Sequence, residues 1–157
     1  MWPVLTAAMA ALEGSRLALT IRDSLALTAS LSALHVVGFT LIMGGALFSN
    51  LRLAGVLLRD HPAVEIVGLG THSIAGGLVI SVITGLLLFA PRASAASASR
   101  IFQIKMALVI TASAVQFLAA RRAAGSHSSG LRTMAGTLGA TIWLGLALAA
   151  CAYILLE

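Results

Sequence analysis

Apolar residues in this chain fall into four long blocks, separated by short polar or charged segments. The blocks cover about residues 25–58, 63–90, 101–120 and 131–156. A helix needs about 20 mostly apolar residues to cross a bilayer, and each block is of about that length or longer. The segment RDHP at 59–62 ends the first block with charge and begins the second with a proline. The pattern predicts an all-α fold, an integral membrane four-helix bundle.

The segment before the first block is apolar but broken. Pro3, Glu13 and Arg16 interrupt it, so it is too short and too polar to span a bilayer. Such a segment is typical of an amphipathic helix that lies in the membrane interface. We therefore expect two units, an interfacial helix over residues 1–23 and the four-helix bundle over residues 24–157.

Composition agrees with a membrane protein and changes how the net charge is interpreted. Hydrophobic residues make up 59% of the chain and charged residues 10%, where a soluble domain carries about a quarter charged residues. The net charge is +5, but the basic residues are scattered over predicted helix ends and loops. There they would set topology and meet lipid phosphates, so the expected partner is the lipid bilayer and not nucleic acid. They divide five and five between the two faces, which leaves the orientation open, with both termini on the same side.

Ionisable side chains inside spans are costly, and we treat them as functional hypotheses. Three stand out: His35, His72 and Lys105. Counting away from the first turn at 1.5 Å per residue places His35 level with Thr84 and about 18 Å from His72 along the membrane normal. A single metal ion or haem iron could not easily join two histidines at that separation. Counting from the second turn places Lys105 within about one turn of His35.

The polar side chains therefore suggest two sites near opposite membrane faces. His35, Ser32 and Lys105 would form the first, and His72 with Gln116 would form the second. Lys105 and Gln116 share one face of the third span, because eleven residues make about three helical turns.

Structural alternatives to a cofactor site stay open on the pattern alone. A buried histidine can be a hydrogen-bonded core residue, and a lysine near a helix start can extend to the interface. Small residues flank both histidines: Gly38 and Gly45 lie on the side of His35, and Gly68 and Gly76 precede and follow His72 at spacing four. They either leave room for a flat ring or let helices approach closely.

Three segments of the chain resemble a known group of bacterial membrane proteins. The segments are ALHVVGFTLIMGGALFSNLRL (33–53), VITGLLLF (82–89) and FQIKMALV (102–109). They look like the histidine-bearing first core helix and the "TG…F…K" signature of small four-helix membrane proteins related to the copper-resistance D type. More distantly, they are similar to the membrane protoporphyrinogen oxidase type. The resemblance covers roughly residues 15–122 and implies a multi-pass protein of the bacterial inner membrane.

In the protoporphyrinogen oxidase relatives a first-helix histidine and a later lysine are associated with haem b, and the matching residues are His35 and Lys105. The leading hypothesis is a haem-b or porphyrin-binding protein in redox or electron transfer. Neutral His35 would be an axial ligand, with its other nitrogen held by a backbone carbonyl or by Ser32. Lys105 would pair with a propionate or ligate the iron, and His72 with Gln116 would serve a second cofactor or a quinone.

Two other functions stay open. A copper transport or copper-resistance protein would use His35, Met43 and His72 as stations for Cu(I). A structural membrane subunit would bind no cofactor. The sequence shows no nucleophile beside a base, no paired carboxylates and no phosphate-binding loop, so we do not expect a hydrolase. Whether the chain is a membrane oxidoreductase, which redox protein it would meet and whether it forms a homo-oligomer stay open.

Overall fold

A computed structural model describes the backbone of residues 2–156 and their side chains, except those of residues 2, 3, 119 and 149–156. All regular elements in this part of the chain are helical, which confirms the all-α prediction. The long helices are long and apolar enough to cross a membrane. They are α3 (Leu25–Leu53), α4 (Ala63–Phe89), α6 (Arg100–Val115) with its continuation through η2 (Gln116–Ala120) and α7 (Arg121–Ala124), and α8 (Ser129–Leu156).

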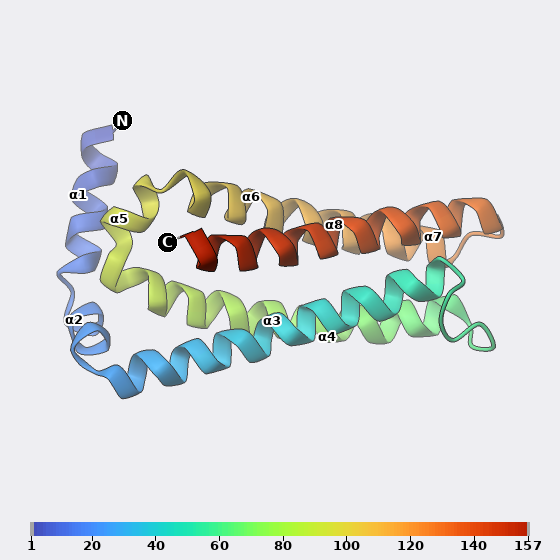
Figure 1. Cartoon of the computed structure of the whole chain (residues 1–157), viewed down its shortest axis with the longest axis horizontal. Helices are drawn as coiled ribbons and strands as arrows, with labels where there is room; N and C mark the ends of the chain where they lie inside the picture. The colour runs from blue at the N-terminus through green and yellow to red at the C-terminus, as the bar shows by residue number, and fades with distance from the viewer. Residues whose placement is uncertain (1, 157) are drawn as a thin grey trace.

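The long helices form two antiparallel pairs, α3 with α4 and α6 with α8 (Figure 1). The largest interface joins α3 to α4, and α8 crosses onto α3. The loops between α3 and α4 and between α7 and α8 lie at one end of the bundle (Figure 1). Both ends of the chain lie at the other end, beside η1 (Ala90–Arg92) and α5 (Ala93–Ala98), which connect α4 to α6.

The N-terminal segment forms two helices and not the single helix that we expected. They are α1 (Trp2–Glu13) and α2 (Arg16–Asp23), which meet at an angle of 54°. The break follows from Gly14 and from Ser15, whose hydroxyl caps α2 by accepting from the amide of Ala18 at 3.3 Å. Both helices lie across the terminal end of the bundle (Figure 1). There a Glu13 carboxylate oxygen accepts from the amide of Ser94 in α5 at 3.3 Å.

Helix α3 ends at Leu53, five residues before the predicted end. Gly55 has φ +72° and Leu58 has φ +53°, conformations that no α-helix contains. Arg52 stabilises the loop that follows, because its guanidinium donates to the carbonyl of His61 from Nε at 2.8 Å and from Nη2 at 2.6 Å. The apolar letters that follow Leu53 therefore belong to a loop and not to the span.

The α3–α4 interface is built on glycines that bring the two backbones into contact. A Cβ on Gly45 would lie 2.6 Å from the carbonyl oxygen of Gly70, and one on Gly77 would lie 2.5 Å from that of Gly38. No real Cβ is found so close to another atom, so larger residues would force the helices apart. Small residues are the usual means of close helix packing in membranes, where the hydrophobic effect does not draw helices together.

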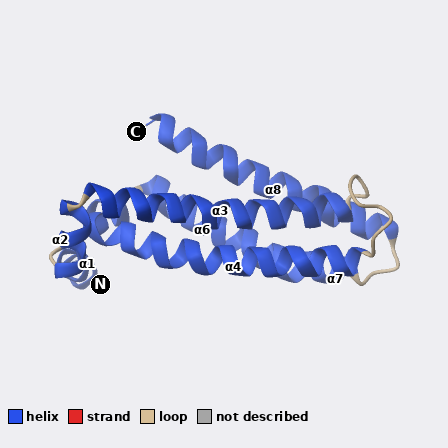
Figure 2. Ribbon diagram, turned by 90° about the horizontal axis from the view of Figure 1, so that it is seen from below, coloured by secondary structure: helices blue, strands red, loops and turns tan. Residues whose placement is uncertain are grey.

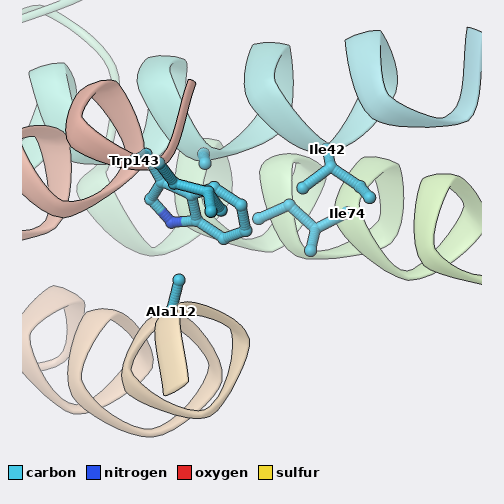
Figure 3. Packing of buried hydrophobic residues seen from close by; sticks show 6 residues of the cluster. Ile42, Ile74, Ala112 and Trp143 are labelled. Atoms are coloured by element: carbon cyan, nitrogen blue, oxygen red, sulfur yellow. The ribbon is translucent and has the colours of Figure 1, made fainter. Parts of the chain in front are cut away.

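The hydrophobic core extends from the middle of the bundle toward the loops. Trp143 of α8 is 1% exposed and packs among residues from all four long helices (Figure 3). The residues of this cluster are Ile42, Ala46, Ile74, Ala112, Trp143 and Leu146. Toward the termini the packing is much looser. No residue over 25–37 or 100–111 is buried, and α8 diverges from α3 in this direction (Figure 2).

Candidate functional site

His35 lies on the side of α3 that faces α4, in the looser half of the bundle. Its Nδ1 is 3.0 Å from the hydroxyl oxygen of Thr84 on α4. This contact confirms the prediction from hairpin counting that the two residues are level. The His35 side chain is partly exposed, so one side of the imidazole is held by α4 and another is accessible.

The hydrogen bonds of Thr84 fix which His35 nitrogen carries the proton. The Thr84 hydroxyl donates to the backbone carbonyl of Ile80 at 2.7 Å, and a carbonyl can only accept. Its single hydrogen is thereby used, so its oxygen accepts from Nδ1–H of His35. The neutral imidazole then carries its free lone pair on Nε2. A histidine held in this way through one nitrogen is prepared to bind a metal through the other.

Gly85, beside Thr84, provides the room for the ring. A Cβ at Gly85 would lie 3.1 Å from Cε1 of His35, closer than most real contacts. A larger residue at this position would therefore press on the imidazole and turn it from the Thr84 hydroxyl. The TG dipeptide of the second span thus supplies a hydrogen-bond acceptor and a gap for the same side chain.

Lys105 of α6 is the charged group nearest this site. Its ammonium is close enough for its charge to act on the imidazole of His35, as the depth estimate predicted. Within the described residues it makes no hydrogen bond and no ion pair. The site thus combines a neutral imidazole with an unpaired cation.

Ser32 does not have the role that we predicted for it. It is exposed on α3, one turn from His35, and Thr84 holds Nδ1 in its place. The predicted second site is not assembled either. His72 is exposed on α4, and its Nδ1 donates to the carbonyl of Gly68 in its own helix at 2.8 Å. Gly68 and Gly76 face open space and not a neighbouring helix.

Gln116 is buried among polar groups of two other helices and does not meet His72. Its side-chain oxygen accepts from Nδ2 of Asn50 on α3 at 2.8 Å and from Nε1 of Trp143 on α8 at 3.1 Å. Asn50 also packs against Gly139 of α8, and its Oδ1 is buried without a hydrogen-bond partner. This cluster connects three helices at the depth of the hydrophobic core.

The residues suggested as copper stations do not lie on one path. Met43 is partly buried against the core around Trp143, His35 faces Thr84, and His72 points away from the bundle. Within the described part of the chain, no three His, Cys, Asp or Glu side chains are grouped so that they could hold a metal ion.

Two functional features were missed by the sequence reasoning. Hairpin counting placed Thr84 at the level of His35, but we did not assign it as the hydrogen-bond partner. The signal was present, because Thr84 is a hydroxyl residue followed by glycine at the matched depth. The hydrogen bond between Trp143 and Gln116 was not predicted either. Counting residues from the loop between the third and fourth spans is not accurate enough to pair individual side chains.

The comparisons with known proteins provide no family for the chain. No family model, no curated protein and no solved structure matches it. The function is therefore argued from the site itself.

Proposed function

We propose that this chain is a multi-pass membrane protein that binds haem b, or a closely related metalloporphyrin, through His35 and takes part in electron transfer. The observation that carries the proposal is the hydrogen bond from His35 Nδ1–H to Thr84, which leaves the Nε2 lone pair for a metal. The four long apolar helices support the membrane location, which we take to be the bacterial inner membrane.

The residues around His35 fit such a group in three respects. Thr84 orients the imidazole through Nδ1, while Nε2 would bind the metal. This is the usual arrangement of a metal-binding histidine. Gly85 leaves space for the ring, and no residue over 25–37 or 100–111 on the surrounding helices is buried. A flat apolar macrocycle needs such a surface, which the tightly packed half of the bundle lacks.

Lys105 supplies the charge that the carboxylates of a porphyrin require. An ammonium without an anionic partner is costly within or near a bilayer, and a propionate would neutralise it. Lys105 lies little more than one turn from the start of α6. Its long side chain can therefore place the ammonium toward the interface while its stem lies along the helix. The bound haem would supply one-electron chemistry, and the protein would fix its position, exclude water from it and set its potential.

The test is an optical spectrum of the purified protein after expression with added haem precursor. We expect a Soret band in the natural protein and its loss in His35→Ala. Thr84→Val should weaken the band, because the imidazole loses the group that orients it. His72→Ala is the matched control, since it removes the exposed histidine of the neighbouring helix and should leave the band intact. Circular dichroism of each variant separates loss of ligand from loss of fold.

Two results would overturn the proposal. One is the absence of a Soret band in the natural protein when haem is supplied during expression. The other is a His35→Ala variant that keeps the full band. Lys105→Gln tests the carboxylate contact separately: we expect weaker haem retention, restored by Lys105→Arg, which keeps the positive charge.

A further inference from the structure

The third long helix contains one irregular stretch. Residues Gln116–Ala120 form η2, a π-helical segment between the α-helical stretches α6 and α7. A π-helical turn holds one more residue than an α-helical turn and interrupts the regular ladder of backbone hydrogen bonds. Such turns are found where helices bend, and they are frequent at functional sites.

The helix is fixed to the bundle on the C-terminal side of this segment. Gln116 is 4% exposed and holds hydrogen bonds from Asn50 and Trp143. The following turns are buried against α3 and α4 in a second apolar cluster. This cluster consists of Leu53, Ala63, Val67, Ala120, Ala123 and Ala124.

The helix is hardly packed on the N-terminal side of the same segment. From Arg100 to Thr111 no residue is buried, and its main neighbour is α8, which diverges from α3 in this region (Figure 2). At its far end α6 is attached by Phe102, whose ring stacks on Phe89 of α4 with centroids 5.4 Å apart and planes 20° apart. Gln103 adds one hydrogen bond, from its Nε2 to the carbonyl of Ser97 in α5 at 2.8 Å, so few contacts hold this end compared with the core at the other end.

We propose that residues 100–111 form a hinged gate beside His35, with η2 as the hinge and the Phe89–Phe102 stack as the latch, while Ala112, about one turn from the hinge, stays in the core. Opening would admit a flat apolar ligand from the bilayer to the imidazole, and closing would bring Lys105 to the anionic groups of that ligand. The identity of the ligand rests on the function proposed above. The movement of the helix does not, because it follows from the distribution of packing along α6.

The experiment measures distances between pairs of spin labels in lipid nanodiscs, in a Cys151→Ser background. One pair, Ile104→Cys with Val82→Cys, joins exposed positions of α6 and α4 in the loosely packed half. The matched control pair, Leu69→Cys with Leu138→Cys, joins exposed positions of α4 and α8 in the packed half. Both pairs are first measured without haem, so the gate is tested independently of the cofactor.

We expect two distance populations for the first pair and one narrow population for the control pair. Phe102→Ala should shift the first pair toward the longer distance, because it removes the latch. Deletion of Leu118, an exposed residue of η2, should restore regular α-helical turns and leave one population. A single population as narrow as that of the control pair, unchanged by Phe102→Ala, would overturn the gate.

Addition of haem tests the ligand separately from the movement. We expect haem to shift the first pair toward the shorter distance, and this shift should be absent in His35→Ala. If two populations exist but haem does not change their ratio, the assignment of the ligand is overturned. The proposed function would instead fail in the optical spectrum, so the two proposals can be told apart.

Discussion

The two halves of this bundle are both rich in apolar residues but differ in packing. The packed half, from the middle of the helices to the interhelical loops, holds the core around Trp143 and the second apolar cluster around Val67. The open half, nearer the chain termini, holds no buried residue over 25–37 or 100–111. Lipid chains are as apolar as leucine, so apolar side chains alone do not draw helices together in a bilayer. The difference shows that glycines and hydrogen bonds decide where these helices pack.

Glycines act differently in the two halves. In the packed half Gly45 and Gly70 let the backbones of α3 and α4 touch, and Gly136 of α8 does the same against α3. In the open half Gly85 faces only the ring of His35. One set of glycines therefore joins helices, while Gly85 makes room for a side chain.

Polar groups show the same contrast. Gln116 in the packed half accepts from two donors on two other helices, an arrangement that uses its side-chain oxygen fully. In the open half His35 uses one ring nitrogen, and Lys105 has no partner within the described residues. The first arrangement stabilises the protein, whereas the second leaves groups available to a ligand.

The largest predicted effect compares the same substitution in the two halves. Ile74→Ala removes a side chain that is 0% exposed in the core, and Ile110→Ala removes one that is 68% exposed on α6. We expect Ile74→Ala to lower the free energy of unfolding by about 2–4 kcal/mol, because it leaves a cavity among four helices. Ile110→Ala should change it by less than about 0.5 kcal/mol. Unfolding in mixed micelles with increasing dodecyl sulfate, followed by tryptophan fluorescence in a Trp2→Phe background, measures both values.

Equal losses for the two isoleucine variants would contradict the comparison. They would mean that α6 packs along its whole length, and the hinged gate would lose its physical basis as well. Circular dichroism of the same samples checks that each variant begins from the same helix content.

A second prediction concerns the contact between α3 and α8. A Cβ on Gly136 would overlap backbone atoms of Asn50 and Ala54, so Gly136→Ala must separate the two helices. We expect a loss of about 1–3 kcal/mol in the same unfolding assay. Gly145→Ala is the control on the same helix, because nothing lies within 4 Å of its Cβ position. An equal loss in the control would show that the effect comes from α8 itself and not from its contact with α3.

Position along the bundle axis could be predicted from the sequence, but direction around each helix could not. A helix rises by a constant amount per residue, so counting from the turn before Pro62 was enough to place His35 at the level of Thr84. Helix α4 is apolar on all sides, and no polar face shows which side meets a neighbour. The direction of His72 therefore could not be predicted, and it faces away from the bundle.

Two backbone features were also not predicted, although Arg52 and Gly55 are a usual signal for the end of a helix. The apolar run continues past Leu53, and the helix ends there because of the positive φ of Gly55 and the bonds from Arg52 to the loop. The π-helical segment begins at Gln116, which is held by Asn50 and Trp143, and its residues, QFLAA, are ordinary helix formers. The hydrogen bonds of Gln116 join segments far apart in the chain, whereas those of Arg52 are local.

The smallest predicted effect concerns the contact that holds α1 at the open end. Hydrogen bonds from Ser94 lower the pKa of the Glu13 carboxyl below its ordinary value of 4.5. A lowered pKa in the folded state stabilises the contact above the ordinary value, and this contribution is lost as the pH falls through the folded-state pKa. We expect the amides of α1 and α5 to exchange hydrogen for deuterium faster in acid, after correction for the intrinsic exchange rate, with the packed half unchanged.

Glu13→Gln is the matched variant, because it keeps the size of the side chain and removes the titrating carboxylate. It should show the faster exchange of α1 and α5 at neutral pH and no further change on acidification. If the natural protein and Glu13→Gln respond to acid equally, another group ties α1 to α5. If the packed half also loosens in acid, the two halves are not independent, because the carboxylate contact is confined to the terminal end of the bundle.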